Sequence, residues 1–436
     1  MQYMERNLKG KTILFLDGSA GNICVIEKAK ELGARTVVAN FFPDETQPAK
    51  QTADQSCRVN FWDAEAIRNL VKEEHIDGIF TTASDSHLRA YSLICEDNGF
   101  FAYATSKQIE DISNKIRFKE LCPQYGLKVI PEYTIHDADD ISTLDIQYPV
   151  MVKSPDNSGG SKGMTLVYEE SALPAAIELA KEYSPTKSVV VEHYIDGDEF
   201  VINYMFVDGE PFVLYTKDYC KAIQDGQVLR DNAMISPSKF EKLFYEKADK
   251  KLREMFKGIG MKNGIIFLQC FVEDEDLYFF EGGCRAGGAD EYYLWEDIYG
   301  VDFIKCLLRF AAYGGYNEPN LQEILATTKQ TKVESVLNVL LNPGTIKEIK
   351  GADEVANLPE VLTSHVNVVP GENIQEDFTS GQIGMRVMVS AKDKDDYIRV
   401  VDQIYRTLQF VSEDGRNMLK PRIRFEHWLF DEPMNG

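Results

Sequence analysis

The sequence predicts a chain of mixed class, with a doubly wound parallel α/β domain at the N-terminus followed by α+β domains. Residues 12–105 alternate apolar runs of strand length with segments of helical periodicity, which is typical of a parallel sheet between two layers of helices. After residue 150 the pattern changes to β-hairpins joined by acidic or glycine-containing turns. With 436 residues the chain is too long for one core, so several domains are expected.

The N-terminal pattern contains strand-like and helix-like segments in alternation. Strands are expected at residues 12–16, 36–39 and 78–82, and helices at residues 23–32, 64–74 and 88–98. The loop after the first strand, Asp17 to Gly21, has two glycines but no GxGxxG motif, and no ribose-binding acid follows at the usual distance. We therefore expect a structural α/β domain here and not a dinucleotide site.

Composition narrows the class of protein. Hydrophobic residues make up 44% of the chain and aromatic residues 11%, which is enough for sizeable cores and argues against a largely disordered chain. The formal net charge of -23 argues against nucleic acid or an anionic membrane as a partner, because such binding needs a basic surface. One small anion is still compatible, since a few cations and backbone N–H groups suffice to bind it.

The eight cysteines are scattered, without a CxxC pair. Zinc sites and disulfide frameworks need tighter spacing, so we expect reduced thiols and a cytoplasmic location. Residues 1–11 are polar and contain no apolar stretch typical of a signal peptide, and no apolar run in the sequence is long enough to cross a bilayer.

A loop rich in small residues follows a strand-like run that ends in Lys153. Ser158, Gly159 and Gly160 lie in this loop, and a second strand is expected at residues 164–168. Such a loop can bring several backbone N–H groups close to phosphate oxygens, and Lys153 could reach the same phosphates. Because no helix follows, the loop is not a P-loop. The alternative is a surface hairpin without a ligand.

Two glutamates flank a glycine turn further along the chain. Glu192 ends an apolar run, and Glu199 follows Gly197 at the start of the next strand. Glu192 could accept a hydrogen bond from an adenine amino group, and Glu199 could accept from ribose hydroxyls. The alternative is a pair of surface acids beside a turn. Asp208 and Gly209 then predict a tight hairpin.

A hairpin near residue 275 is predicted to bring an amide and a carboxylate together. If the turn is centred between Asp274 and Asp276, Gln269 lies opposite Glu281, with Cβ atoms roughly 4.5–5.5 Å apart. A carboxylate and an amide oxygen at this separation can hold Mg²⁺. Arg285 shares the face of Glu281 if the strand continues, so a cation would lie beside the metal, as phosphoryl transfer requires.

In their order along the chain, these motifs resemble the ATP-grasp superfamily. The resemblance is carried by Lys115 after a helix start, Lys153 with its loop, Glu192 with Gly197-x-Glu199, and Glu281-x-x-x-Arg285. It covers residues 10–430 and implies a central ATP-grasp fold of two α+β subdomains. The implied domains are residues 1–113, residues 114–318 with a lid subdomain at about 150–216, and a C-terminal α+β domain at residues 319–436.

The resemblance also implies a role for each matching residue. Phosphates would be bound by Lys115, Lys153, Ser158, Gly159 and Gly160, the nucleoside by Glu192, Glu199 and the backbone near Tyr194 and Ile195, the metal by Gln269 and Glu281, and the reacting carboxylate by the catalytic Arg285. The implied cofactors are ATP and Mg²⁺, which Mn²⁺ could replace. The chain departs from the family's Glu-x-Asn-x-Arg pattern at Gly283, which offers no side-chain oxygen to a metal.

Together these features predict an ATP-dependent carboxylate–amine ligase that forms an amide or peptide-like bond through an acylphosphate, acting on an amino acid or small carboxylate. The alternatives are an enzyme similar to biotin carboxylase or carbamoyl phosphate synthetase, one similar to phosphoribosylamine–glycine ligase, and a nucleotide-binding protein without catalysis. The expected partners are a small carboxylate and an amine, with neither nucleic acid nor membrane, and a homodimer is compatible with the sequence. The sequence identifies neither substrate.

Overall fold

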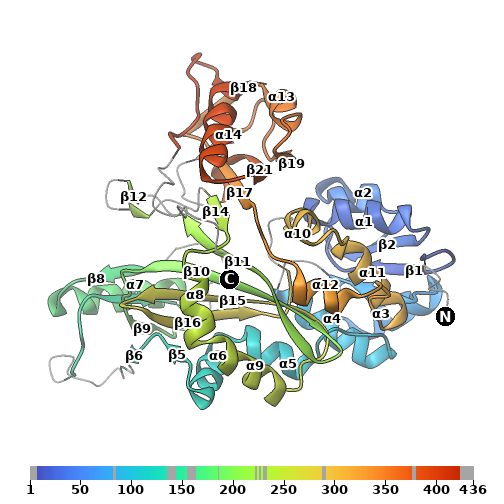
Figure 1. Ribbon diagram of the computed structural model, residues 1–436, viewed down its shortest axis with the longest axis horizontal. Coiled ribbons are helices and arrows are strands. Elements are labelled where there is room, and N and C mark those ends of the chain that lie inside the picture. Colours follow the sequence, from blue (N-terminus) through green and yellow to red (C-terminus); the bar gives the residue numbers. More distant parts are fainter. Residues whose placement is uncertain are drawn as a thin grey trace.

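The computed structural model describes residues 7–81, 85–133, 135, 144–154, 164–184, 186–220, 223–224, 227–228, 233–286, 291–375 and 380–422. A long sheet crosses the molecule, with the N-terminal domain at one end and a small four-stranded sheet at the other (Figure 1). The C-terminal segment, coloured orange to red, rises from the middle of the long sheet. Within these residues, no helix combines the length and the apolar character that a membrane span requires.

The N-terminal domain is built on a parallel sheet with the strand order β3-β2-β1-β4. Its strands are β1 (Thr12–Phe15), β2 (Arg35–Asn40), β3 (Gln55–Arg58) and β4 (Gly78–Phe80). The three predicted strands are confirmed. The edge strand β3 escapes sequence-based prediction because its residues are mostly polar and none of them is fully buried.

Helices cover both faces of this sheet. They are α1 (Ile23–Glu31), α2 (Pro48–Thr52), α3 (Ala64–Glu73) and α4 (Asp85–Asn98), and α5 (Ser106–Ser113) follows. Leu14 is buried in an apolar cluster with Ile67 of α3, whereas the adjacent Phe15 is buried in another cluster with Val25 of α1. Because successive side chains of a strand point to opposite faces, the predicted doubly wound arrangement is confirmed.

In the described part of the chain, the long sheet has nine strands in the order β19-β21-β17-β14-β11-β10-β15-β16-β5. Six of these strands precede the C-terminal segment: β5 (Lys128–Val129), β10 (Asp198–Val207), β11 (Glu210–Cys220), β14 (Ala233–Ser236), β15 (Gly264–Glu273) and β16 (Asp276–Gly283). The predicted hairpin at Asp208 and Gly209 is confirmed, and both residues have the positive φ that this tight turn requires. A two-stranded ribbon of β12 (Ile223–Gln224) and β13 (Gln227–Val228) follows β11.

The small sheet has the strand order β6-β9-β7-β8. Its strands are β6 (Glu132–Tyr133), β7 (Val150–Lys153), β8 (Thr165–Val167) and β9 (Val190–His193), and α7 (Leu173–Tyr183) packs against them. β10 and β11 pair within the long sheet, although residues 198–216 are predicted to belong to the lid at about 150–216. The small sheet therefore occupies residues 132–193, and the bounds of the three domains stay predictions.

The central part carries α6 (Lys115–Leu121), α8 (Glu241–Lys247), α9 (Asp249–Gly258), α10 (Tyr292–Tyr299), α11 (Phe303–Tyr313) and α12 (Leu321–Thr327). Ala248 has a φ of -127°, and its departure from helical geometry separates α8 from α9. α11 contacts β4 at Gly78, where any β-carbon would overlap the carbonyl group of Ala311. A glycine is therefore needed for the central helix to dock on the N-terminal sheet.

The C-terminal segment continues the long sheet through β17 (Val333–Leu340), β19 (Val361–Val366) and β21 (Ile383–Ala391). A three-stranded sheet is formed by β18 (Gly344–Lys350), β20 (Asn373–Ile374) and β22 (Gln409–Ser412), with α13 (Ala352–Ala356) and α14 (Lys394–Thr407) beside it. The predicted α+β character of this segment is confirmed. Its main sheet is shared with the central part, because β17 pairs with β14.

Two carboxylates, the buried Glu334 and the half-buried Asp297, join α10 to the C-terminal strands. Glu334 on β17 is fully buried, and the hydroxyl of Ser390 on β21 lies 3.0 Å from Glu334 Oε1 and 2.8 Å from Asp297 Oδ2. Burial, together with the negative charge of Asp297, raises the pKa of Glu334 to about 8. Lys332 pairs with Asp297 at 2.7 Å and favours the ionised form of Asp297. Burial and the charge of Asp297 favour the protonated form of Glu334, and together they outweigh the opposite effect of Lys332 on Glu334.

The raised pKa of Glu334 predicts a loss of stability as the pH rises. The folded state favours the protonated carboxyl, so this contribution is fully present below the unfolded pKa of 4.5 and is lost as the pH passes about 8. The melting temperatures of wild-type protein and Glu334→Gln should be similar at pH 5, and the variant should be the more stable at pH 9. A matched control is the exposed Glu348→Gln. A stability difference that does not change with pH would contradict this account.

Candidate active site

The hairpin of β15 and β16 brings the two predicted metal ligands together. Gln269 pairs directly with Glu281, as predicted. The turn itself differs from the expected one, because Glu273 pairs with Asp276 and the turn has two residues, Asp274 and Glu275, both with positive φ. A register shift between Gln269 and Cys270 adds one residue on the β16 side and restores the predicted pairing.

At the level of Gln269 and Glu281, four residues on neighbouring strands of the long sheet are directly paired. Lys217 of β11 pairs with Val201 of β10, Val201 with Gln269, and Gln269 with Glu281. Directly paired residues share one face of a sheet, so the row places Lys217 on the face of the predicted metal ligands. Lys217 is buried and forms an ion pair with the buried Glu291, which directly precedes α10.

Each of the two predicted metal ligands contacts another predicted site residue. Lys115 Nζ lies 3.1 Å from Glu281 Oε2, and Gln269 Nε2 donates to Glu199 Oε1 at 2.7 Å. Lys115 is held at the start of α6, where the side chain of Asn114 caps the helix by accepting from two backbone N–H groups. The structure therefore brings together a predicted phosphate ligand, both predicted metal ligands and the predicted ribose ligand.

A second group of charges surrounds Glu192 on β9. Its Oε1 pairs with Lys153 at the end of β7, and its Oε2 lies 2.9 Å from Lys119 of α6. Burial lowers the pKa of Lys153. Attraction to Glu192 raises this pKa again, but only in part, because Lys119 and Lys115 repel the Lys153 ammonium. Burial raises the pKa of Glu192, but the two lysines outweigh it and hold the pKa below its ordinary value. This arrangement suits an anion, because added negative charge would relieve the repulsion at Lys153.

The predicted adenine-binding residues connect β9 to β10. The backbone N–H of Tyr194 donates to the carbonyl of Pro149 at 3.0 Å, and Ile195 is buried. At Gly197 any β-carbon would overlap the carbonyl of Val272, so this turn lies directly against β15. The carboxylate of Glu192 contacts the two lysines, and its contact with adenine stays a prediction. Ser158, Gly159 and Gly160 lie outside the described residues.

Gly283 and Phe267 together position Arg285. Phe267 pairs with Gly283, and its ring fills the space that a side chain at residue 283 would need. The Arg285 guanidinium carbon lies 4.6 Å from the centre of this ring, within the range of a cation–π contact. An aromatic ring therefore takes the place of the metal-ligating asparagine expected at residue 283, and it supports the predicted catalytic arginine. Cys284 is buried in an apolar cluster that also contains Leu268.

The donor atoms present suit a divalent cation that phosphate oxygens help to coordinate. Gln269 and Glu281 contribute an amide oxygen and a carboxylate from directly paired positions. Among the residues that the structure describes, no three His, Cys, Asp or Glu side chains gather into a metal cluster. Mg²⁺ commonly uses one or two protein carboxylates together with substrate phosphates and water, so the residues fit such an ion.

In the first loop of the N-terminal domain, the side chain of Asp17 accepts hydrogen bonds from donors of the same loop. Asp17 follows β1, and its carboxylate accepts from the backbone N–H of Ser19 at 2.9 Å and from the Ser19 hydroxyl at 2.7 Å. These donors stand before α1, where a doubly wound fold often binds a phosphate. A carboxylate already engages them and would repel a phosphate, so this loop is poorly suited to phosphorylated substrates.

Sequence reasoning did not identify Lys119, Lys217 or Glu291 as members of the site. Lys119 could have been found, because it lies one helical turn after Lys115 and residues four apart share a helix face. The pair of Lys217 and Glu291 could not, because the two residues are far apart in the sequence and their contact depends on how α10 crosses the sheet.

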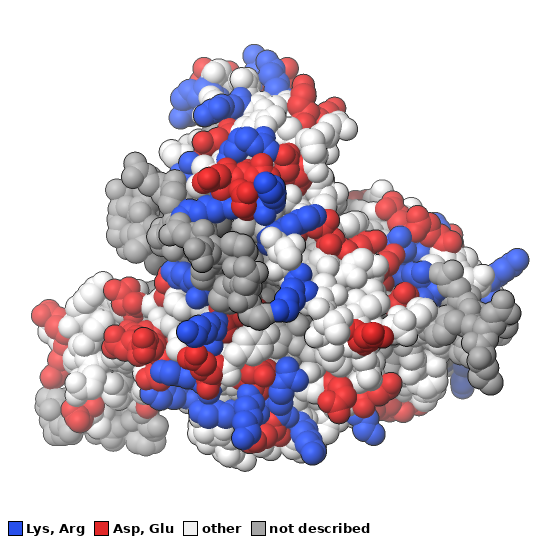
Figure 2. Space-filling model, viewed as in Figure 1, with Lys and Arg blue, Asp and Glu red and all other residues white. Residues whose placement is uncertain are grey.

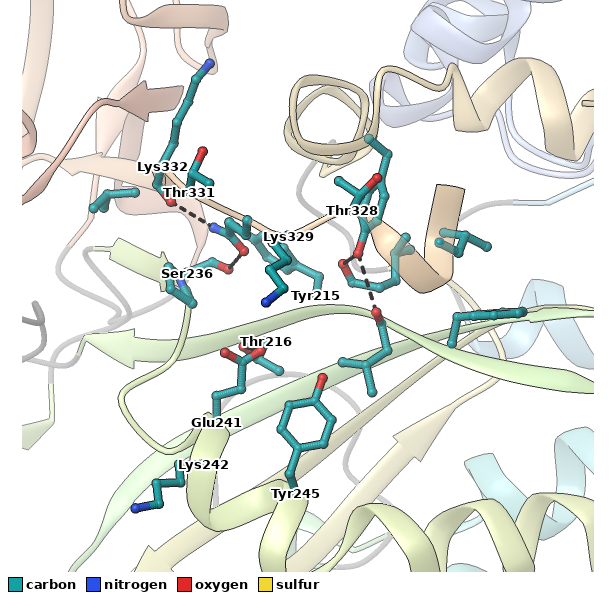
Figure 3. A pocket seen from close by; sticks show the side chains of 18 of the residues that line it. Tyr215, Thr216, Ser236, Glu241, Lys242, Tyr245, Thr328, Lys329, Thr331 and Lys332 are labelled. Carbon is teal, nitrogen blue, oxygen red and sulfur yellow. Dashed lines mark hydrogen bonds between the residues drawn. The ribbon is translucent and has the colours of Figure 1, made fainter. Parts of the chain in front are cut away.

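A separate cavity of about 1360 Å³ lies between β11, α8 and the segment that leads to β17 (Figure 3). Its walls include Thr216, Glu241 and Tyr245, and none of the predicted site residues lines it. Gln330 accepts from Ser236 Oγ at 3.0 Å and donates to the carbonyl of Lys332, which ties the connecting segment to β14. This cavity is therefore distinct from the row that contains Gln269 and Glu281.

Acidic and basic side chains are interspersed over the face shown in Figure 2. The chain as a whole carries a formal net charge of -23. A nucleotide would therefore have to be attracted by the local lysines of the site and not by a broad basic surface.

Two family models match parts of the chain. The model for the D-ala D-ala ligase C-terminus matches residues 126–221, and the model for the L-amino acid ligase C-terminal domain 2 matches residues 339–413. The first match contains Lys153, Glu192 and Glu199. The second covers most of the C-terminal α+β segment.

The chain is also similar to whole proteins. It is 27% identical over 284 residues to a formate-dependent phosphoribosylglycinamide formyltransferase of Sulfurisphaera tokodaii, covering 62% of this chain and 69% of the relative. In two other curated relatives, the propionyl-CoA carboxylase alpha chain of Caenorhabditis elegans and a formate-dependent phosphoribosylglycinamide formyltransferase of Prochlorococcus marinus, the matched region spans 42% and 50% of the relative's length.

Among solved structures, the L-amino acid ligase of Bacillus licheniformis has a TM-score of 0.75 at 17% identity, with 94% of this chain and 100% of that chain covered. The biotin carboxylase domain of the Hydrogenobacter thermophilus 2-oxoglutarate carboxylase, determined as a dimer with MgADP, has a TM-score of 0.72 at 20% identity, with 94% and 91% covered.

Fold, motif order and family matches together define the class: the chain belongs to the ATP-grasp superfamily. Within this superfamily it belongs to the ligases that convert ATP to ADP.

The Gly283–Phe267 contact predicts a specific double-mutant result. Gly283→Asn should displace the Phe267 ring and lower stability by about 1–3 kcal/mol, because the added side chain overpacks a filled space. In the double variant with Phe267→Ala, the loss of stability should be clearly smaller than the sum of the two single losses, because the added side chain then has space. Urea unfolding of the two single variants and the double variant measures this difference. Additive losses would show that the two positions are not coupled.

Removal of the Glu192 charge should change the pH dependence of nucleotide binding. Without Glu192, the pKa of Lys153 should fall further, so ATP affinity should decline at a lower pH in Glu192→Gln than in wild type. Titration with a fluorescent ATP analogue between about pH 7 and 10 measures this shift. Glu132→Gln, which removes an exposed partner of Lys119 only, is the control. Identical pH profiles in wild type and Glu192→Gln would refute the role of this ion pair.

Proposed function

We propose that the protein is an ATP-dependent carboxylate–amine ligase that acts on an amino acid or a small carboxylate and releases ADP and phosphate. The observation that carries the proposal is the direct pairing of Gln269 with Glu281, contacted by Lys115 and followed by Arg285 over the Phe267 ring. This arrangement offers two metal ligands, a cation for phosphate and a planar cation for a carboxylate, all near one end of β16.

In the proposed reaction, a carboxylate oxygen of the substrate attacks the γ-phosphorus of ATP, and the bond between the γ-phosphorus and the bridging oxygen of ADP breaks. The amine nitrogen then attacks the acyl carbon, the bond from this carbon to the phosphate oxygen breaks, and the nitrogen loses its proton. Arg285 would hold the carboxylate, and Lys115, Lys119 and Lys153 would offset phosphate charge. Bound Mg²⁺ would stabilise the negative charge of the transferred phosphoryl group.

Two observations favour an amine ligase acting on an unphosphorylated substrate. The match to an L-amino acid ligase domain at residues 339–413 supports the proposal that the substrate is an amino acid. The Asp17 carboxylate engages the donors that a phosphoribosyl substrate would need in the N-terminal loop, which disfavours the alternative similar to phosphoribosylamine–glycine ligase. A role similar to biotin carboxylase would instead make turnover depend on bicarbonate.

The accompanying proposals are ATP and Mg²⁺, or Mn²⁺, as cofactors, and a cytoplasmic location. The similar biotin carboxylase domain contains MgADP, which supports the choice of nucleotide and metal. All eight cysteines are free thiols, several of them buried, as expected in a reducing compartment. Small molecules are the proposed substrates, and a homodimer stays a prediction.

Release of ADP with pooled amino acids tests the proposal. Wild-type protein should form ADP in a reaction that needs both Mg²⁺ and amino acids, and hydroxylamine should trap the acylphosphate as a hydroxamate. ADP formation that requires bicarbonate, or tight ATP binding with no turnover, would reject the ligase.

Two variants then test the assigned residues. Glu281→Gln should lose at least 100-fold of the Mg²⁺-dependent ADP formation, on the order of the effect of removing one charge-stabilising group. Arg285→Ala should show a similar loss with ATP affinity largely retained, because the arginine contacts the carboxylate and not the nucleotide. Lys250→Ala, outside the site, is the control. Turnover like that of wild type in Arg285→Ala would remove the arginine from the mechanism.

A further inference from the structure

The cavity of about 1360 Å³ beside β11 exists because β14 is shorter than β11. β14 pairs with residues 218–220 of β11, whereas β10 pairs with residues 210–219. In the described part of the chain, residues 210–217 of β11 therefore have a neighbouring strand on one side only. On the other side lies the cavity, bounded by α8 and by the connecting segment, residues 328–332, which leads from α12 to β17 (Figure 3).

Two side chains already bind the free edge of β11. The hydroxyl of Tyr299 donates to the carbonyl of Leu214 at 2.8 Å, and Arg253 Nη1 donates to the carbonyl of Pro211. An edge that is capped in this way and contains a proline is a poor template for another β-strand. A ligand in the cavity would therefore be recognised through side chains and not through strand addition.

Side chains of opposite charge project into the cavity from opposite walls. Glu241 points into it from α8, and Lys329 points toward Glu241 from the connecting segment (Figure 3). The hydroxyl of Thr216 donates to Glu241 Oε1 at 3.3 Å, and no described lysine or arginine forms an ion pair with this carboxylate. Among the described carboxylates, none forms an ion pair with Lys329 either. The cavity therefore separates two charges that could each bind a group of opposite sign.

The carboxylate of Glu241 is only partly compensated for its burial. Glu241 is half-buried, and burial raises its pKa, which the hydrogen bond from Thr216 opposes only in part. Burial, together with the negative charge of Glu241, raises the pKa of Tyr245, so the Tyr245 hydroxyl stays protonated and able to donate. A cationic group in the cavity would favour the ionised form of Glu241. The wall formed by α8 therefore suits an ammonium group.

Charge and size together specify the class of ligand. An ammonium beside Glu241 and a carboxylate beside Lys329 would each gain a partner of opposite charge. Phe212 and Leu325 add apolar surface to the walls, which suits an apolar side chain. The volume of about 1360 Å³ exceeds the roughly 300–1,000 Å³ of ordinary small-molecule pockets, so a molecule longer than one amino acid has room. A short peptide with free ends meets these conditions, and a free amino acid carries the same two charged groups.

We propose that this cavity is a second ligand site, separate from the row that contains Gln269 and Glu281. It binds the zwitterionic form of an amino acid or short peptide, with the ammonium at Glu241 and the carboxylate at Lys329. Because Glu241 belongs to α8 and Lys329 to the connecting segment, the bound molecule would tie the C-terminal segment to the central part. The site goes beyond the ligase function proposed above and does not require it, since the binding involves neither ATP nor Arg285.

Calorimetric titration with L-leucyl-L-leucine and with L-leucine, in the absence of nucleotide, tests the site. At least one of the two should bind wild-type protein and Arg285→Ala with the same affinity. Glu241→Gln and Lys329→Gln should each weaken this binding about tenfold, as expected for the loss of one hydrogen bond between charged groups. Glu323→Gln and Lys347→Gln, which change exposed residues outside the cavity, are the matched controls.

Blocked dipeptides test the orientation of the ligand. N-acetyl-leucyl-leucine lacks the ammonium, so Glu241→Gln should not weaken its binding further. Leucyl-leucinamide lacks the carboxylate, so Lys329→Gln should not weaken its binding further. Failure of both leucine and leucyl-leucine to bind wild-type protein would overturn the assignment, and so would equal affinities in wild type, Glu241→Gln and Lys329→Gln. Formation of ADP is measured separately, so this site and the ligase function can fail independently.

Discussion

The register of the β15–β16 hairpin is the constraint on which the proposed chemistry depends. A slip of one residue would turn Glu281 to the other face of the sheet and separate it from Gln269. The bulge between Gln269 and Cys270 holds the pairing, and the neighbouring contact of Phe267 with Gly283 continues it toward Arg285. Because β15 also pairs with β10, the same register carries the row of residues across to Lys217 on β11.

Electrostatic pairing prepares the site for a highly charged nucleotide. Lys115, Lys119 and Lys153 are each held by a glutamate, which keeps the ammonium groups in position without a ligand. Two glutamates of this arrangement, Glu192 and Glu281, come from different strands of different sheets, so the small sheet and the long sheet are joined through these charges. Phosphate oxygens could replace the glutamates as partners of the lysines, and the ordering of the side chains would already be in place.

The departure at Gly283 and the loop that contains Asp17 point to adaptation within a common fold. Where the superfamily pattern has an asparagine, this chain has a glycine whose space is filled by the Phe267 ring. Where a doubly wound domain often binds phosphate, this chain has Asp17. Both changes remove a ligand contact that the superfamily pattern or the fold would offer, and the change at Gly283 lies beside Arg285.

Much of the fold and part of the site follow from the sequence alone. Alternating apolar periodicity determined the doubly wound N-terminal domain, and local turn residues determined the hairpins at Asp208 and near residue 275, because these patterns involve neighbours in sequence. The pairing of Gln269 with Glu281 was predicted as well, but the two-residue turn and the bulge that together produce it were not. Tertiary structure decided that the C-terminal strands extend the central sheet, that β10 and β11 lie outside the small sheet, and that Lys217 meets Glu291. Those features depend on contacts between distant segments, whose register and crossing are set by packing and not by periodicity.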